Sequence, residues 1–465
     1  MKHLKKQLVT ILFFSFTFVS TYELHWQWNS ISLTDISFPA SFFWGIADSA
    51  LQVEGSMSAH GPITEDSWLA FEKSHNIPVR VGDACERWTR YKEDIERAAQ
   101  LGIRMYRFSI CWSKIEPQEG IFDQAALDHY IDFVDCLLAH GITPMITLFH
   151  HSYPTWIDKK GGLEIFSNFY YFLRFSEHVF KQLHKKVPYW ITFNEPIAFA
   201  LEGFFRGTYP PGKTSFKMAG IVARNFLFSH VEVYQHLKKI NPSVHIGIAH
   251  MINPIDAYGS WNPIEKLATR AFGSLLNEMP LNFFKTGKFR WIMLVSDYLE
   301  NAPQSLDFIG INYYTHTVVR QTSFFKLNPV TRSEEKIVSA SQGEHDDRGY
   351  YPSKVLYAEG LYRAIELASE LNLPIFVTEN GSSTADPALQ EEFIKKHIYV
   401  VSKAIKEGHP VKGYLYWTLT DCFCWRRGYR NKHGIFSVDF VTQERTFRPV
   451  FNHFKEVIEK TKKST

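Results

Sequence analysis

The sequence predicts an α/β fold, a single (β/α)8 TIM barrel with its active site at the C-terminal ends of the strands. Two observations predict it. Short apolar runs alternate with amphipathic stretches from residue 38 to about 456, and polar residues gather where the runs end. The 465 residues suit one large barrel with long loops. An open doubly wound sheet is the alternative, and it is disfavoured because no glycine-rich phosphate turn follows the first run.

Eight runs have the length and the β-branched or aromatic content of buried parallel strands. They are Phe43–Ala47, Met105–Ile110, Pro144–Phe149, Trp190–Asn194, His245–His250, Phe308–Asn312, Pro374–Thr378 and Tyr414–Leu419. Between them lie stretches with helical periodicity: Tyr91–Leu101, Ala125–His140, Phe166–Leu183, Ile221–Lys239, Ala358–Leu371 and Leu389–Glu407. Eight strands that alternate with helices favour a closed parallel barrel.

The N-terminus has the pattern of an export signal. Three lysines within the first six residues precede a 13-residue apolar segment, Leu8–Ser20, which is short for a membrane span. Val19 and Thr21 fit the small-residue rule for cleavage only loosely, so residues 1–21 are a signal peptide or an uncleaved N-terminal anchor. Either interpretation predicts a secreted, periplasmic or cell-envelope protein.

The remaining chain divides into a lead-in segment at 22–36, the barrel domain at 37–458 and a basic tail at 459–465.

The net charge of +3 argues against nucleic acid as a partner, and contact with a membrane is expected only if the N-terminal segment is uncleaved. Five irregularly spaced cysteines form no disulfide framework or zinc motif, so neither a metal nor a cofactor is expected. The oligomeric state is left open.

Two of the expected strands end abruptly in a carboxylate. Glu379 follows the run Phe376–Thr378, and Glu195 follows Trp190–Asn194. Parallel strands of a barrel deliver their last side chains to the same mouth. Two carboxylates delivered there are the minimal equipment for cleaving a glycosidic bond.

Other polar and aromatic residues occupy the same positions on the neighbouring strands. One such residue alone is usually a satisfied structural group, but so many favour a common site. The set comprises Gln52, Glu54, Arg107, His150, His151, Asn194, Asn312, Tyr313, Tyr314, Asn380, Trp417, Asp421 and Trp425.

A series of motifs runs through the barrel in order: Phe43–Gly45, Leu51–Gly55, Arg90–Asp94, Tyr106–Trp112, Thr192–Pro196, Gly310–Tyr314, Thr378–Gly381 and Gly413–Trp417. With them the chain resembles glycoside hydrolase family 1, the β-glucosidase family of retaining β-glycosidases, from Phe38 to about Phe451. The resemblance implies hydrolysis of a terminal β-linked sugar through a covalent glycosyl–enzyme intermediate, with a small glycoside as substrate and no cofactor.

The resemblance also implies roles for particular residues. Glu379 would be the nucleophile and Glu195 the general acid/base, with the two carboxyl groups about 5–5.5 Å apart. Arg107, Asn312 and Tyr314 would support them. The substrate would be bound by Gln52, His150, Asn194, Trp417, Cys424 and Trp425.

Three positions depart from the family pattern and leave the sugar and the aglycone open. Cys424 stands where the family's glucosidases have an acidic residue that binds O4 and O6, and a thiol is a weak acceptor. His151 replaces an aromatic residue, and Lys354 stands, in a loose alignment, where a Trp commonly lines the leaving-group subsite.

The residues that follow Cys424 raise an alternative substrate. Arg426 and Arg427 suit an anionic group at the sugar 6-position, although Asn431 and His433 do not match the family's 6-phospho-glycosidases. The alternatives are therefore a glycosidase for a 6-modified (phospho, uronate or disaccharide) substrate, a transglycosidase, and a non-catalytic sugar-binding relative.

Overall fold

The computed structural model describes residues 23–77, 79–259, 261–323, 326–339 and 354–463. The 1–21 segment expected to be a signal peptide or anchor lies outside the described residues. No helix among the described residues is long and apolar enough to cross a membrane.

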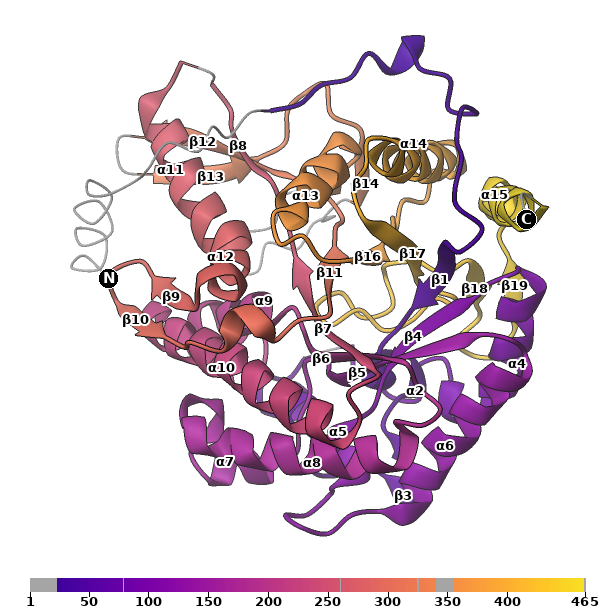
Figure 1. Ribbon diagram of the computed structural model, residues 1–465, viewed down its shortest axis with the longest axis vertical. Helices are drawn as coiled ribbons and strands as arrows, with labels where there is room; N and C mark the ends of the chain where they lie inside the picture. Colours follow the sequence, from indigo (N-terminus) through magenta and orange to yellow (C-terminus); the bar gives the residue numbers. More distant parts are fainter. Residues whose placement is uncertain (1–22, 78, 260, 324–325, 340–353, 464–465) are drawn as a thin grey trace.

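Eight parallel strands close into a barrel at the centre of the molecule (Figure 1). Their order around the barrel is β1, β4, β5, β6, β7, β11, β16 and β17, with β17 pairing back to β1. The strands are β1 (Phe43–Ala47), β4 (Met105–Ser109), β5 (Thr143–Phe149), β6 (Tyr189–Asn194), β7 (His245–Met251), β11 (Phe308–Asn312), β16 (Ile375–Asn380) and β17 (Val411–Trp417). The predicted TIM barrel is thus confirmed, and the open sheet is excluded because β1 and β17 pair.

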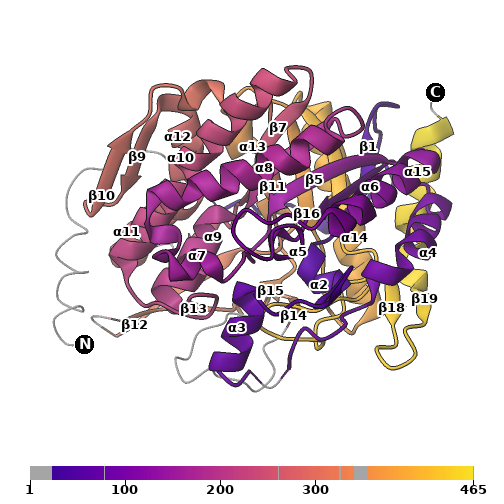
Figure 2. The ribbon, with the colours of Figure 1, turned by 90° about the horizontal axis from the view of Figure 1, so that it is seen from below.

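Helices cover the outside of the barrel (Figure 2). The principal ones are α4 (Arg87–Gln100), α6 (Gln124–Ala139), α8 (Phe169–Leu183), α10 (Phe216–Ile240), α11 (Pro263–Gly273), α12 (Met279–Thr286), α13 (Glu359–Ser369), α14 (Pro387–Lys406) and α15 (Asn452–Lys463). The helix α10 begins five residues before its predicted start because Ser215 caps it, its side chain accepting from the Met218 N–H.

Shorter elements complete the chain. They are α2 (Ala50–Glu54), α3 (Ser67–Ser74), α5 (Trp112–Ile115), α7 (Trp156–Lys159), α9 (Pro196–Leu201), β2 (Met57–Ser58), β3 (Gly61–Pro62), β8 (Ile255–Ala257), β9 (Lys288–Trp291), β10 (Val295–Tyr298), β12 (Thr317–Ser323), β13 (Lys326–Val330), β14 (Ile337–Ser339), β15 (Lys354–Val355), β18 (Phe436–Val438) and β19 (Arg445–Phe447). Several of them, including α3, β12–β13 and β14–β15, gather on one side of the barrel, in the lower part of Figure 2.

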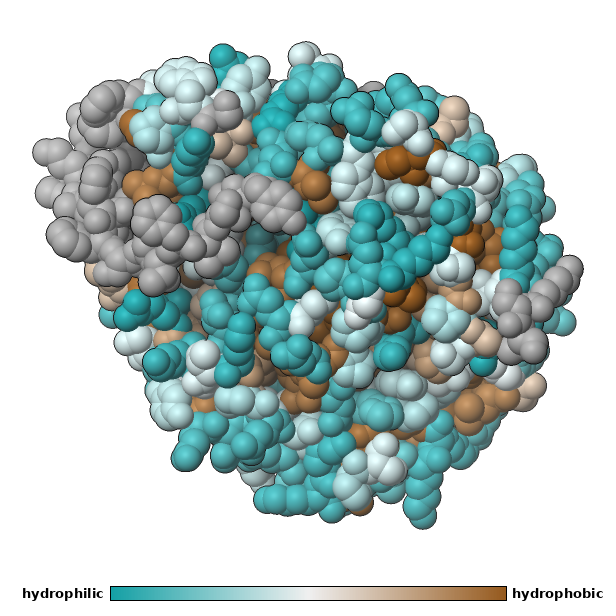
Figure 3. Space-filling view, turned by 45° about the horizontal axis from the view of Figure 1, so that its top comes forward, coloured by the Kyte–Doolittle hydropathy of each residue, from teal (hydrophilic) through white to brown (hydrophobic). Residues whose placement is uncertain are grey.

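Two hydrophobic layers hold the barrel. Inside it, one buried cluster takes a side chain from each strand: Ala47, Met105, Met145, Ile191, Ala249, Phe308, Phe376 and Leu415. Outside it, a larger cluster joins the strands to the helices. Because strand side chains alternate between these layers, the polar residues at the strand ends are held at fixed positions. On the face in Figure 3, hydrophilic residues predominate and hydrophobic ones form small groups.

The first and the last described segments both contact the body of the protein. The basic residues at 460 and 462 belong to α15 and are exposed to solvent, whereas the hydroxyl of the buried Thr461 between them accepts a hydrogen bond from Trp44 Nε1 at 3.0 Å. In the lead-in segment, Trp26 and Trp28 pack against Tyr362 and Tyr399 of α13 and α14. Neither part is a loose appendage.

Candidate active site

Glu379 is turned into the barrel mouth by an irregularity in the sheet. Its register with β11 shifts between Ile311 and Asn312, and its register with β17 shifts between Val377 and Asn380. Such bulges re-aim side chains next to active sites. Glu379 is buried, and its two oxygens have separate donors: Arg107 Nη1 at 2.8 Å and the Tyr314 hydroxyl at 2.7 Å. Both contacts stabilise the ionised carboxylate.

Glu195 is placed by a change of backbone direction at the end of β6. Its φ of 45° lies in the left-handed region, which costs an L-residue about 1 kcal/mol. The turn is held by its own N–H, which donates to the Ala249 carbonyl at 2.8 Å, and by Pro196, which starts α9. The carboxyl accepts a hydrogen bond from Asn312 Nδ2 at 2.8 Å.

The surroundings of Glu195 keep it protonated. Burial, and then the charge of Glu379, raise its pKa to about 7, although the Asn312 hydrogen bond and the cations Arg107 and Lys354 oppose them. Glu379 thus lies in an ion pair with Arg107, while the raised pKa of Glu195 favours its protonated form up to about neutral pH. This division of states is what a general acid beside a nucleophile requires.

Asn194 and Asn312 connect the two carboxyl groups. Asn194 Oδ1 accepts from Arg107 Nη2 at 2.6 Å and from Asn312 Nδ2 at 3.0 Å. Asn312 Oδ1 accepts from the Thr378 hydroxyl at 2.7 Å. Thr147 accepts from Arg107 Nε at 3.1 Å. The arginine is thereby fixed at every nitrogen, so Glu379 meets a preorganised charge.

His150 and His151 form one side of the site with their rings 5.1 Å apart. His150 Nε2 lies 3.2 Å from Asn194 Nδ2, and His151 Nε2 lies 3.2 Å from the Asn194 carbonyl. Burial lowers the pKa of His151 to about 3 and that of His150 well below its ordinary value, so both rings are neutral. Neutral imidazoles can both donate to and accept from sugar hydroxyl groups.

Trp417 and Trp425 enclose the same space. The Trp417 ring is stacked on His150 at 5.8 Å, and Trp425 lies 6.1 Å from His151 and 4.5 Å from Trp68. His150 Nδ1, His151 Nδ1 and Trp425 Nε1 are among the buried side-chain atoms of the described residues that have no hydrogen-bond partner in the protein, and these three lie together in the site. Buried polar atoms are normally paired, so these three indicate a polar ligand.

Gln52 contacts the loop that carries Cys424. Gln52 Nε2 donates to the Phe423 carbonyl at 2.6 Å, and its Oε1 accepts from the Ser49 hydroxyl at 2.7 Å. The Cys424 thiol accepts a weak hydrogen bond from Asn431 Nδ2 at 3.9 Å. Gln52 is therefore held beside the loop that carries Cys424, and the role of the two residues in binding sugar stays a prediction.

Lys354 lies beside Tyr314. Its Nζ lies 4.0 Å from the centre of the Tyr314 ring, whose hydroxyl donates to Glu379. Burial lowers the pKa of Lys354, and its charge acts on Glu195, Glu379 and Cys424. The position singled out as a departure from the family thus faces both carboxyl groups.

Not every polar residue at a strand end reaches the site. Glu54 is buried in ion pairs with Arg87 and Lys114, and Asp421 pairs with Arg448. Arg426 lies 3.4 Å from Glu202.

Two residues that sequence reasoning missed are Thr378, one position before Glu379, and Tyr209, a loop residue whose ring is 5.6 Å from His151. Tyr209 gives no signal in the sequence because it follows no strand.

The model of one sequence family, glycosyl hydrolase family 1, matches residues 34–463. The chain belongs to glycosyl hydrolase family 1. It is a glycoside hydrolase, and membership supports the predicted retaining β-glycosidase activity; the alternatives are not favoured by the relatives.

Family relatives extend over most of the chain. Beta-glucosidase A of Acetivibrio thermocellus is 32% identical over 459 residues, covering 92% of this chain and 99% of its own. Among solved structures, a beta-glycosidase from Pyrococcus horikoshii has a TM-score of 0.80 at 31% identity, over 92% of this chain and 96% of its own. Beta-glucosidase from Thermotoga maritima in complex with deoxynojirimycin has a TM-score of 0.81 at 29% identity, over 92% and 99%.

The position of Lys354 leads to a prediction about pH. The Lys354→Met variant removes a positive charge that lowers the pKa of Glu195, so that pKa should rise. Because Glu195 must be protonated to act as an acid, the alkaline limb of the kcat/KM profile should move to higher pH, by roughly 0.5 unit. The measurement is kcat/KM for a nitrophenyl β-glucoside from pH 5 to 9.

Lys336→Met is the matched control, because Lys336 precedes β14 and pairs with Glu392 on the surface. Its profile should coincide with that of the unmodified enzyme. An unchanged limb in Lys354→Met, or a limb moved to lower pH, would contradict the electrostatic role.

Proposed function

We propose that this family member hydrolyses β-glucosides or closely related β-glycosides with Glu379 as nucleophile and Glu195 as general acid/base. The observation that carries the proposal is the asymmetry between the carboxyl groups. Glu379 is ion-paired to Arg107 and bonded to Tyr314, whereas burial and the charge of Glu379 raise the pKa of Glu195 to about 7. The relatives named above, which are called beta-glucosidases and beta-glycosidase, support the sugar class.

In the first step, Glu379 attacks the anomeric carbon and the glycosidic bond breaks. Glu195 gives its proton to the departing oxygen, so the aglycone leaves as an alcohol. The resulting ester removes the charge of Glu379, which had raised the pKa of Glu195. Glu195 is then a stronger acid, and its ionised form accepts a proton from the water that attacks the ester. Both residues return to their starting states.

The neighbouring groups bind and orient the sugar in this proposal. Asn194, fixed by Arg107, faces the 2-hydroxyl, where contacts that strengthen in the transition state matter most. Gln52 and His150 bind the 3- and 4-hydroxyls, and Trp417 and Trp425 cover the ring. Cys424 replaces a carboxylate acceptor with a weak one, so the 6-hydroxyl contributes less to affinity than in family members with an acid there.

Trapping the covalent intermediate tests the proposal directly. The protein is incubated with 2-deoxy-2-fluoro-β-glucosyl fluoride, and intact and peptide masses are recorded. We expect one glycosyl adduct, located on Glu379, and none in Glu379→Gln. The galactosyl and mannosyl reagents, run in parallel, rank the sugars by labelling rate. An adduct on another residue, or no adduct with any sugar in folded protein, would overturn the assignment.

We also propose that the protein acts outside the cytoplasm. The three lysines and the apolar segment Leu8–Ser20 support export. Both a cleaved signal and a retained anchor agree with this location.

A further inference from the structure

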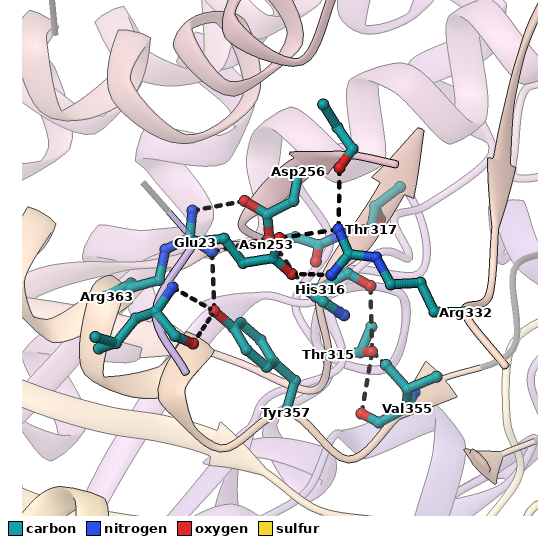
Figure 4. A network of polar contacts seen from close by, with 12 residues as sticks. Glu23, Asn253, Asp256, Thr315, His316, Thr317, Arg332, Val355, Tyr357 and Arg363 are labelled. Atoms are coloured by element: carbon teal, nitrogen blue, oxygen red, sulfur yellow. Dashed lines mark hydrogen bonds and ion pairs between the residues drawn. The ribbon is translucent and has the colours of Figure 1, made fainter. Parts of the chain in front are cut away.

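The first described residues are fixed to the body of the protein (Figure 4). Glu23 forms a two-pronged ion pair with Arg332, with Nη2 2.8 Å from Oε2. The Leu24 N–H donates to the Tyr357 hydroxyl at 3.1 Å, and that hydroxyl donates to the Leu24 carbonyl at 2.8 Å. The place where the N-terminal segment joins the fold is therefore defined.

A network of charges holds this place. Asp256 accepts two hydrogen bonds from Arg363, both at 2.9 Å, and lies 3.1 Å from His316 Nδ1. Glu335 lies 2.5 Å from His316 Nε2. Although burial opposes it, the two carboxylates raise the pKa of His316. With His316 protonated, three carboxylates face three cations, so the attachment of Glu23 is electrically balanced.

Exposed aromatic and aliphatic side chains lie beside this attachment. Arg332, which holds Glu23, also donates to the Ala257 carbonyl at 2.9 Å. The next residue, Tyr258, is 40% exposed, Trp261 is 83% exposed and Ile264, at the start of α11, is 43% exposed. Of the twelve tryptophans, all within the described residues, only Trp261 is exposed.

The exposure of these side chains is imposed by the fold. Glu265 accepts from the Gly259 N–H and the Gln321 N–H, each at 2.7 Å, and so ties their loop to β12. The Tyr258 N–H donates to the Val319 carbonyl at 2.9 Å. Neighbouring apolar side chains that the fold holds in solvent are typical of an interaction surface.

Basic residues border this surface, and few residues separate Glu23 from the apolar N-terminal segment. Arg320 lies 4.4 Å over the Tyr258 ring, and Lys266 is exposed on α11. Tryptophan, tyrosine and basic residues together suit the headgroup layer of a bilayer. The apolar segment ends at Ser20, three residues before Glu23, and three residues span at most about 10 Å.

We propose that the surface formed by Tyr258, Trp261 and Ile264 rests on a lipid bilayer to which the protein is held by its own uncleaved N-terminal segment. A bilayer that contains Leu8–Ser20 must lie close to Glu23, and the surface begins at Tyr258, next to the Ala257 carbonyl that Arg332 binds together with Glu23. Arg320 and Lys266 would contact anionic headgroups at its edge. The proposal concerns attachment and is independent of the sugar that the active site accepts.

Quenching of tryptophan fluorescence tests the proposal. The full chain is made by cell-free synthesis, without a signal peptidase, in the presence of vesicles of phosphatidylcholine and phosphatidylglycerol at a ratio of about 7:3, a strongly anionic surface. Half of the preparations contain phosphatidylcholine brominated on its acyl chains. We expect the brominated vesicles to quench part of the emission, and Trp261→Phe to lose at least half of that quenched part.

An added tryptophan on another part of the surface is the matched control. Val441 is 93% exposed between β18 and β19, which lie across the molecule from α11 in Figures 1 and 2. In the Trp261→Phe background, Val441→Trp should add emission that bromine does not quench. The proposal fails if the full chain does not bind the vesicles, if Trp261→Phe is quenched as strongly as the unmodified chain, or if the emission added by Val441→Trp is quenched equally.

Turnover separates this proposal from the enzymatic one. Trp261→Phe should hydrolyse a nitrophenyl β-glucoside at the unmodified rate, because Trp261 lies outside the active site. Loss of quenching in Trp261→Phe with unchanged turnover supports the proposed membrane-facing surface. If the unmodified chain is quenched by the brominated vesicles but hydrolyses no glucoside, only the proposed enzymatic activity is contradicted.

Discussion

Glu379→Gln is expected to lower kcat for a nitrophenyl β-glucoside by roughly 10⁵-fold, comparable with removal of a covalent nucleophile from other hydrolases. The amide cannot form the glycosyl ester, and its nitrogen would meet the Arg107 guanidinium or the Tyr314 hydroxyl, which now donate to the carboxylate. Initial rates with p-nitrophenyl β-glucoside, together with circular dichroism of the variant, measure the effect.

Glu392→Gln is the control for this substitution. Glu392 is on α14 and pairs with Lys336 and Lys396, away from the reacting atoms, so turnover should stay within about twofold of the unmodified value. A folded Glu379→Gln protein that keeps more than a hundredth of the activity would disprove the role of Glu379 as nucleophile.

Glu195→Ala is expected to lower kcat by about 10²- to 10⁴-fold, in a manner that depends on the leaving group. The dinitrophenolate of a dinitrophenyl β-glucoside departs without needing a proton. The glycosidic bond of this substrate therefore still breaks rapidly, and the glycosyl–enzyme accumulates. An aglycone of high pKa needs the proton and should become almost inert. Steady-state and burst kinetics across a series of aryl glucosides measure both effects.

Added azide gives the confirming readout for Glu195→Ala. A small anion can occupy the space of the missing carboxylate and attack the glycosyl ester without general-base assistance. The rate with the dinitrophenyl substrate should rise with azide, and the product should be the β-glucosyl azide. A uniform loss across all leaving groups with no response to azide would indicate that Glu195 acts structurally.

The strands and the carboxylates could be predicted because their pattern is local. A buried parallel strand needs a short apolar run, and a residue that follows it is delivered to the barrel mouth, so Glu195 and Glu379 are visible in the chain. The family motifs are local for the same reason. The eight strand positions and the assignment to the family were correct on this basis.

Other features depend on contacts between distant segments. Glu54 and Asp421 have the same sequence pattern as the site residues, yet ion pairs with Arg87, Lys114 and Arg448 hold them elsewhere in the structure. Trp44, at the other end of the chain, donates a hydrogen bond to the Thr461 hydroxyl and so ties the last turns of α15 to the barrel. Burial and charge partners of this kind are set by packing, which periodicity does not describe.

The barrel, the two carboxylates and the kind of chemistry can be predicted from the order of amino acids alone, because strand periodicity and strand ends are encoded over a few residues. The different surroundings of the two carboxyl groups arise from contacts that form only in the folded protein. Arg107 from β4, Tyr314 after β11 and Lys354 from β15 converge on Glu379 and Glu195 from separate parts of the chain. Coulomb energy depends on distance in space and on burial. The charges and the burial that act on each carboxyl group are therefore set only when the barrel has formed.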